Sequence, residues 1–280
     1  MADQAELIIN GRHVRPRGGL RRHAEGPFVC LQHVAPRLGG GVASSDRGPV
    51  LTGQGRECPL AGTGFQEGDL YFAPLPLVAR FFGAGCYWDQ SSNTWVLGQE
   101  NPLLRGKSIL LDPGHGGQDA GVKGLYGCEE QLNMDLARRL QRLIELGGGL
   151  GLLTRLEGES CTTLKRIEAT RSFQPLLLVS LHHNSSFDPG DNGTETLHNG
   201  RWPSLRLARC IHGELVAELS SYDRGVKESN RSLLRELEVP AAWVELGFLS
   251  NLQDEALALQ ASFRQRAAAA IYRGILAALS

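Results

Sequence analysis

The sequence KSILLDPGHGGQDAGVKGLYGCEE, from Lys107 to Glu130, contains the features that decide the fold and function of this chain. It opens with an apolar run, Ile109 to Leu111, that is typical of a buried strand, and continues into a loop with six glycines. His115 lies in that loop, and Glu129 marks the expected start of a helix. An apolar strand that ends in a loop is where an α/β sheet presents functional groups. An imidazole and a carboxylate placed there can both face one metal ion.

Two later apolar runs, residues 176–181 and 241–244, also lead directly into polar residues. These polar residues are His182, His183 and Asn184 after the first run and Glu245 after the second. Two histidines, one carboxylate and an open position for water form the ligand set of a catalytic zinc site. A further carboxylate nearby would serve as a general base.

With these residues in place, the chain from about Lys107 to Ser280 resembles the zinc-dependent N-acetylmuramoyl-L-alanine amidases of the bacterial cell wall, the Amidase_3 type. The matching segments, in the family's order, are ILLDPGHGGQDAG, CEEQLNMDLARRL, LTR with a downstream Arg166, VSLHHN, GTET and VPAAWVELGFLSN. The resemblance implies a peptidoglycan hydrolase that cuts the amide bond between N-acetylmuramic acid and L-alanine of the stem peptide, with zinc as cofactor. A zinc-binding cell-wall-binding module with little or no catalysis stays open as the alternative.

The resemblance also assigns roles to four residues. They are the zinc ligands His115, Glu129 and His182 and the catalytic base Glu245. His182 and His183 compete for one ligand position, because neighbours along a strand point to opposite sides. The family pattern Ser-x-His-x-Asn favours His182, and His183 then lines the substrate groove or packs in the interior.

A similar choice arises between Glu129 and Glu130. The family reads Glu-Lys-x-x-Asn-Leu at this place, and the position of Asn133 favours Glu129 as the ligand. Glu130 then supplies a negative charge to the first turn of a helix, where the helix dipole favours it. The residues expected to contact substrate or support the ligands are Asp112, Asp119, Asn184, Arg155 and Arg166. The two arginines are expected to hold the fold through ion pairs rather than to touch substrate.

Strands alternate with helices from residue 107 to residue 280, which predicts an α/β catalytic domain with a largely parallel sheet flanked by helices. The expected helices cover residues 131–146, 164–173, 205–219 and 263–279, and a further strand covers 151–154. Some relatives insert an autoinhibitory helix after the GTET-like strand. Here LHNGRWPSL passes directly to the next helix, so no such helix is expected.

Residues 1–100 contain an internal repeat. FVCLQHVAPRLGGGV, residues 28–42, matches FAPLPLVARFFGAGC, residues 72–86, at a constant offset of 44. Each copy has the apolar spacing of a short amphipathic helix ended by glycine, with strands expected at ELIIN before the first copy and NTWVLG after the second. The repeat resembles the copper-amine-oxidase-N-terminal-like module of secreted bacterial proteins. It predicts a smaller α+β module that binds a wall polymer or a division protein.

The name of that module implies no copper. His13, His23 and His33 have no accompanying carboxylate or cysteine spacing, so they are expected to be surface or structural residues. The aromatic residues near the second copy are Trp88, Trp95, Tyr71 and Tyr87. They form either a platform for wall polymers or the module's own small core.

The remaining features of the sequence limit the classes of protein to which this chain can belong. Residues 101–106 are expected to link the module to the catalytic domain, residues 107–280. A formal net charge of −1 argues against a dominant nucleic-acid function. No apolar run reaches 18 residues, so no membrane span is expected, and the start MADQAELIIN lacks a signal-peptide pattern. The resemblance nevertheless implies an extracytoplasmic location, in the periplasm or the cell wall. The six cysteines form no CxxC pair and are expected to be free, buried thiols.

Overall fold

The computed structural model describes residues 5–14, 20–23, 26–46 and 48–280. Contacts between residues divide the chain into two units, Met1–Glu100 and Asn101–Ser280. Every residue that the sequence assigns to the site lies in the second unit. Among the helices of the described residues, none is long and apolar enough to cross a membrane.

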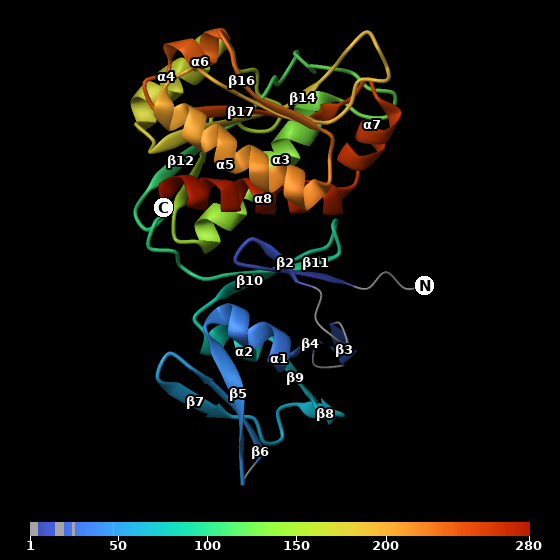
Figure 1. Cartoon of the computed structure of the whole chain (residues 1–280), viewed down its shortest axis with the longest axis vertical. Coiled ribbons are helices and arrows are strands. Elements are labelled where there is room, and N and C mark those ends of the chain that lie inside the picture. The colour runs from blue at the N-terminus through green and yellow to red at the C-terminus, as the bar shows by residue number, and fades with distance from the viewer. Residues whose placement is uncertain (1–4, 15–19, 24–25, 47) are drawn as a thin grey trace. The chain divides into compact units, whose positions relative to one another are not determined.

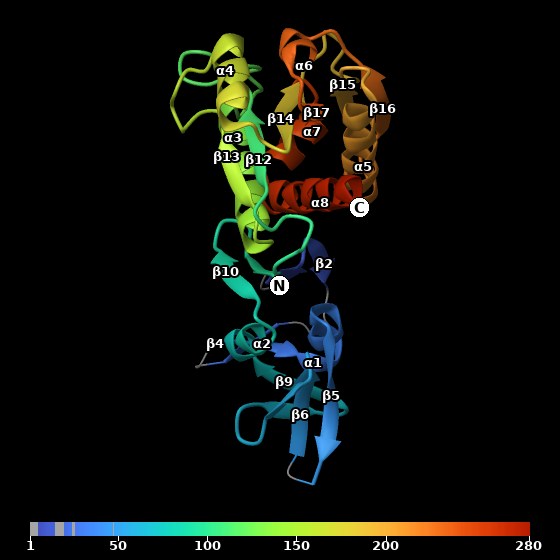
Figure 2. The same ribbon diagram turned by 90° about the vertical axis from the view of Figure 1, so that its left-hand side faces the viewer.

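Six strands form the central sheet of the second unit, and all six are labelled in Figure 2 (compare Figure 1). They are β12 (Ser108–Pro113), β13 (Leu150–Leu153), β14 (Leu177–Asn184), β15 (Thr194–His198), β16 (Asp223–Glu228) and β17 (Ala241–Phe248). Their order across the sheet is β13-β12-β14-β17-β15-β16. The first four of these run parallel, β15 is antiparallel to β17, and β16 is parallel to β15. The predicted α/β class with a largely parallel sheet is therefore confirmed.

Helices cover both faces of this sheet. They are α3 (Glu129–Leu146), α4 (Thr163–Phe173), α5 (Trp202–Leu219), α6 (Ser232–Glu236), α7 (Leu252–Ala258) and α8 (Ala261–Leu279). Figure 1 shows α3, α5 and α8 on one face and α4 and α6 on the other. On the second of these faces, Ile167 of α4 and Leu234 of α6 pack with Leu110 and Leu178 of the sheet. Burial of such apolar surface is the main favourable term in folding.

Helix α3 begins at Glu129, where the sequence predicts the start of a helix, two residues before the predicted apolar stripe of residues 131–146. Its first turn carries Glu129 and Glu130, where negative charge interacts favourably with the helix dipole. Further along, Leu132, Leu136 and Leu140 are buried at the fourfold spacing of a helical stripe. The apolar stripe therefore docks α3 on the sheet and leaves its first residue at the end where β12 stops.

Two strands extend beyond their apolar runs. β14 continues through His182 to Asn184, and β17 continues through Glu245 to Phe248. The reason is that the pairing of β14 with β17 continues beyond the apolar residues, so that His182 lies directly opposite Glu245. These side chains project from the strands themselves rather than from the loops that follow.

Between β15 and α5, a fully described stretch, lie only residues 199–201. As predicted, no helix is inserted there.

The segment 101–106 packs on the second unit. The backbone N–H of Asn101 donates to the carbonyl of Gly147 at 2.9 Å, and Leu104 is fully buried. These contacts tie the segment to the turn that follows α3.

The first unit is the smaller α+β body that the sequence predicts. Its elements are β1 (Glu6–Ile9), β2 (Arg12–Val14), β3 (Arg21–His23), β4 (Gly26–Cys30), α1 (Leu31–Val34), η1 (Ala35–Leu38), β5 (Gly40–Ser45), β6 (Gly48–Gly53), β7 (Arg56–Pro59), β8 (Phe65–Glu67), β9 (Leu70–Pro74), α2 (Leu75–Phe81), β10 (Gly85–Asp89) and β11 (Thr94–Gly98). Its sheets have the orders β10-β11-β1-β2, β3-β4-β9-β8 and β5-β6-β7. The two flanking strands that the sequence predicts, β1 and β11, pair in parallel.

The two copies of the repeat pair with each other. Each copy is a strand followed by a short helix, β4 with α1 and β9 with α2. The two strands are antiparallel, with Val29 opposite Ala73 at the centre of the pairing. The helical segment of each copy is followed by a glycine of left-handed φ, Gly39 or Gly83. The first residues of each copy are therefore strand and not helix, because they form the ladder between the copies.

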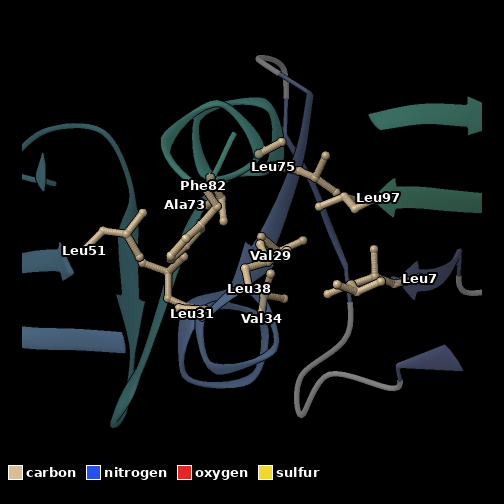
Figure 3. Close-up of a cluster of buried hydrophobic side chains, with 14 of the residues drawn as sticks. Leu7, Val29, Leu31, Val34, Leu38, Leu51, Ala73, Leu75, Phe82 and Leu97 are labelled. Carbon is tan, nitrogen blue, oxygen red and sulfur yellow. The ribbon is translucent and has the colours of Figure 1, made fainter. Parts of the chain in front are cut away.

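Apolar side chains from both copies meet in the core of the first unit (Figure 3). Those labelled in the figure are Leu7, Val29, Leu31, Val34, Leu38, Leu51, Ala73, Leu75, Phe82 and Leu97. Tyr71 joins this core and donates a hydrogen bond of 2.8 Å to the carbonyl of Leu60. Trp95 packs against it, and the ring of Trp88 lies 5.4 Å from that of Trp95. These three aromatic side chains thus contribute to the unit's own packing.

All six cysteines lie in the described part of the chain and are free thiols, as expected. Only Cys30 is buried, however, and Cys86 is exposed. The expectation of burial is wrong for the others because they lie on strand edges, loops and partly exposed helix faces.

Candidate active site

The glycine-rich loop after β12 holds His115 in an uncommon backbone conformation. Its φ of 61° lies in the left-handed region, which non-glycine residues seldom adopt. Such conformations persist where surrounding contacts determine them. Here Arg166 Nη2 donates to the carbonyl of His115 at 2.7 Å, and Asp119 Oδ2 lies 2.8 Å from His115 Nδ1. Arg166 of α4 thus fixes the backbone of this histidine, and Asp119 of the loop fixes its ring.

A second buried arginine, Arg155, also fixes the loop. It donates to the carbonyls of Pro113 and Gly114 at 2.9 and 3.0 Å. Its Nη1 pairs with Glu130 Oε1 at 3.0 Å, so the charge next to Glu129 is neutralised within the fold. Arg155 therefore connects the loop to the first turn of α3.

Asp112 anchors Arg166 in the interior. This carboxylate is fully buried and forms an ion pair with Arg166. It also accepts hydrogen bonds of 2.6 Å from Ser180 Oγ and Thr154 Oγ1. Burial raises the pKa of Asp112, but the charge of Arg166 and the two hydroxyl donors outweigh burial and lower it. An ionised Asp112 supports His115 through Arg166 rather than by direct contact.

Two glycines leave the room that the site needs. A Cβ on Gly114 would lie 2.1 Å from His182 Cε1. A Cβ on Gly121, where φ is 65°, would lie 2.5 Å from Glu129 Oε2 and 2.6 Å from His115 Cδ2. Any larger residue at either position would displace these side chains.

His115, Glu129 and His182 converge on one point. Glu129 Oε2 lies 2.9 Å from His115 Nε2, and Glu129 Oε1 lies 2.9 Å from His182 Nδ1. One ligand atom from each residue lies within 4.8 Å of the other two. Among the described residues, no other group of histidine, cysteine or acidic side chains is close enough to hold a metal ion. Two imidazoles and a carboxylate are the donors that zinc prefers.

The pKa shifts at these residues follow from their contacts. The hydrogen bond with Glu129 raises the pKa of His115 to about 9. Burial raises the pKa of Glu129, but hydrogen bonds from His115 and His182 outweigh it and lower the pKa strongly. Burial lowers the pKa of His182, which favours the neutral imidazole, the form that binds metal ions.

Glu245 lies beside this group on β17 and is buried. Its Oε1 accepts a hydrogen bond of 2.8 Å from Trp243 Nε1, and Arg231 Nη2 lies 3.4 Å from the same oxygen. Its Oε2 finds no hydrogen-bond partner among the residues that the structure describes. Burial raises the pKa of Glu245 to about 7, against the hydrogen bond from Trp243. A carboxyl group that titrates near neutrality suits a general base.

The other predicted residues lie at the margin of the site. Asp119 is exposed and contacts His115, as a residue that orients a ligand would. Asn184 donates from Nδ2 to Glu195 Oε1 at 3.0 Å. Glu195 in turn lies opposite Glu245 across the β15–β17 ladder and pairs with Lys227 at 2.5 Å.

His183 points to the other face of the sheet, as strand alternation requires. Its Nδ1 lies 2.9 Å from Asn133 Oδ1, and Asn133 Nδ2 donates to Glu129 Oε1 at 3.3 Å. Its ring borders a cavity of about 170 Å³ together with Leu246 and Phe263. Burial lowers its pKa to about 4. His183 therefore packs behind the site and supports Glu129 through Asn133.

Three residues beside Glu245 have no role assigned from the sequence: Trp243, Arg231 and Glu195. For Trp243 a signal was present, since it precedes Glu245 by two residues on a strand and must share its face. For Glu195 the signal was its place in the GTET segment, but its position beside Glu245 depends on the pairing of β15 with β17. For Arg231 there was no signal, because the packing of α6 brings it to the site.

Comparison with known proteins agrees with this geometry. The family model described as N-acetylmuramoyl-L-alanine amidase, Amidase_3, matches residues 109–277. The chain belongs to this amidase family. The matched region includes all the site residues from Asp112 to Glu245, so the amidase fold and the converging side chains lie in the same part of the chain.

Three proteins illustrate the similarity. N-acetylmuramoyl-L-alanine amidase LytC of Bacillus subtilis is 33% identical over 178 residues, which cover 62% of this chain and 36% of LytC. The probable cell wall amidase LytH of Staphylococcus aureus is 29% identical over 254 residues, 84% of this chain and 83% of LytH. The solved catalytic domain of the amidase CwlV from Bacillus (Paenibacillus) polymyxa is 30% identical, with a TM-score of 0.58 over 60% of this chain and 96% of that domain. This chain thus spans little more than a third of LytC but most of LytH.

The raised pKa of Glu245 predicts a pH-dependent effect of Glu245→Gln on the metal-free protein. The folded-state pKa of about 7 exceeds the ordinary value of 4.5, so the folded protein binds this proton more tightly than the unfolded chain. Stability from this group is therefore complete below about pH 4.5 and is lost as the pH rises to about 7. Above pH 7 the variant should be more stable by up to about 3 kcal/mol.

Chemical denaturation in the presence of a chelator, at pH 5 and pH 8.5, measures this difference. Glu238→Gln, at an exposed position, is the control and should show little difference at either pH. A stability gain for Glu245→Gln that is the same at both pH values would contradict the assignment of a raised pKa.

Proposed function

We propose that this chain is a zinc-dependent N-acetylmuramoyl-L-alanine amidase that cleaves the bond between N-acetylmuramic acid and the L-alanine of the stem peptide. The observation that carries the proposal is the convergence of His115, Glu129 and His182 beside a buried Glu245, whose Oε2 has no hydrogen-bond partner within the described residues. Membership of the amidase family supports the reaction class.

The residues present fit a zinc ion. His115, Glu129 and His182 would hold it through two ring nitrogens and a carboxylate oxygen, and Gly114 and Gly121 keep the space around these atoms clear. When bound, zinc supplies a Lewis acid that polarises a carbonyl group and makes water more acidic. Three protein ligands leave a position for water or substrate, as in catalytic rather than structural zinc sites.

In the proposed reaction, Glu245 transfers a proton from the attacking water to the leaving nitrogen. Its free Oε2 accepts a proton from the attacking water, whose oxygen forms a bond to the lactyl carbonyl carbon. Glu245 then returns this proton to the nitrogen of L-alanine as the C–N bond breaks. The products are a muramic acid carboxyl group and a stem peptide with a free amino group. The contacts of Glu245 Oε1 with Trp243 and Arg231 keep the carboxylate in place during both transfers.

The alternative is a zinc-binding wall module without catalysis. A module that only binds has no need of a buried carboxyl group with a pKa near 7 beside its metal ligands, because burial of that group costs stability. Glu245 therefore favours the enzyme. A peptidoglycan substrate also implies that the protein acts outside the cytoplasmic membrane, in the periplasm or the cell wall.

The decisive test of this function is digestion of purified muropeptides by Glu245→Gln. The variant should keep its zinc and its fold but lose activity by about a hundredfold or more, the usual size of a general-base contribution. Separation of the products should show a free L-alanine amino group only with the wild-type protein. A variant that stays fully active would remove Glu245 from the mechanism.

The metal ligands predict a zinc content of about one per chain. His115→Ala, Glu129→Ala and His182→Ala should each lower it, as measured by elemental analysis after dialysis. His183→Ala is the matched comparison, because this neighbour of His182 faces the other side of the sheet, where its ring contacts Asn133. Zinc retained by His182→Ala but lost by His183→Ala would reverse the assignment.

We further propose that the first unit binds peptidoglycan, an attached wall polymer or a division protein and so raises the local substrate concentration. The protein truncated to residues 101–280 should then digest soluble muropeptides as fast as the full chain and intact sacculi more slowly. Truncation at residue 101 retains Leu104, which is buried in the second unit. Equal activity on sacculi, with no binding of residues 1–100 to them, would leave the unit without a targeting role.

A further inference from the structure

One side chain, Trp243, contacts both halves of the site. Its indole ring is stacked on the imidazole of His182, with centroids 3.7 Å apart and planes inclined by 9°. Its Nε1–H donates a hydrogen bond of 2.8 Å to Glu245 Oε1. The ligand group and the carboxylate are therefore both held by the same rigid ring.

The ring of Trp243 has a second charged neighbour. The guanidinium of Arg231, the residue that precedes α6, lies 4.5 Å from the centroid of the Trp243 ring. Its Nη2 is 3.4 Å from Glu245 Oε1, the same oxygen that accepts from Trp243. Arg231 thus contacts the indole ring and supplies a second donor to one oxygen of Glu245.

This arrangement distinguishes the two oxygens of Glu245. Oε1 faces both donors, whereas Oε2 is buried without a hydrogen-bond partner among the described residues. The Trp243 N–H therefore prevents the carboxylate from turning freely, and the oxygen that stays available is Oε2. A base has to present a lone pair in one fixed direction, since small displacements of a reacting group lower the rate steeply.

We infer that Trp243 is a positioning residue with two separable roles, one for each half of the site. Its stacked ring orients His182 for the metal ion, and its N–H holds Glu245 so that Oε2 faces the reacting water. The role toward Glu245 rests on the proposed function, and the role toward His182 depends only on metal binding.

Two substitutions separate these roles. Trp243→Phe keeps an aromatic ring against His182 but removes the N–H, and Trp243→Leu removes both. Trp202→Phe is the matched control, because Trp202 is exposed at the start of α5 and belongs to neither half of the site. Each purified protein is loaded with zinc, and its zinc affinity, kcat, KM and melting temperature are measured.

Trp243→Phe should lower kcat about tenfold, with KM and zinc affinity within twofold of the wild-type values. Trp243→Leu should lower kcat at least as much and should also weaken zinc binding about tenfold, the usual size of an effect from residues that orient ligands. Unchanged kcat in Trp243→Phe would overturn the role of the N–H. Unchanged zinc affinity in Trp243→Leu would overturn the role of the stacked ring.

A spectroscopic measurement tests the stack without any activity. Titration of the metal-free protein with zinc alone should change the tryptophan fluorescence, because the indole of Trp243 lies against a ligand ring. Trp243→Phe should lose this change, and Trp202→Phe should keep it. A signal that survives in Trp243→Phe would overturn the contact between indole and ligand. If the wild-type protein binds zinc with this signal but digests no muropeptide, the proposed function fails while the inference about His182 stands.

Discussion

The site depends on one buried carboxylate, that of Glu129. Its two oxygens meet His115 and His182 at 2.9 Å each, and the Val122 N–H donates to one of them at 3.0 Å. A buried charge is costly unless it is fully paired. These contacts therefore bind the first turn of α3, the glycine loop and β14 to one another. The atoms that satisfy the carboxylate are also the atoms that a metal ion would use.

A second buried pair, Asp112 with Arg166, supports the first. Asp112 is satisfied by Arg166 and by two hydroxyl groups, so its charge is retained in the interior. Arg166 passes that support to the loop by donating to the carbonyl of His115. The left-handed backbone of His115 is thus stabilised by an ion pair whose acidic member lies outside the group of His115, Glu129 and His182. Removal of either charge would leave the other buried and unpaired.

Glu129 and Glu245 show how environment sets opposite properties in two like residues. Glu129 accepts several hydrogen bonds, which outweigh its burial and keep it ionised. Glu245 is similarly buried but has few donors, so its pKa rises to about 7. Pairs of carboxyl groups whose environments separate their pKa values commonly divide acid–base roles between them. Here the division matches a ligand role for the first and a base role for the second.

The sequence alone predicted the α/β class and indicated most of the residues of the candidate site. The apolar runs and their polar neighbours, together with the ordered family segments, indicated His115, Glu129, His182 and Glu245. Alternation along a strand showed that His182 and His183 could not both join the site. These signals are local. They depend on the spacing of apolar residues, on the positions of glycines and on the order of residues within one motif.

Only the tertiary structure decided the partners of these residues. Trp243 follows from alternation, but its stacking on His182 depends on the alignment of β14 with β17. Arg231 and Glu195 reach Glu245 because α6 and β15 pack there, and no local pattern specifies that. In the first unit, the first residues of each repeat copy became strands because the copies pair with each other. Contacts between distant segments are set by packing and by strand register. Neither can be read from the sequence of a single segment.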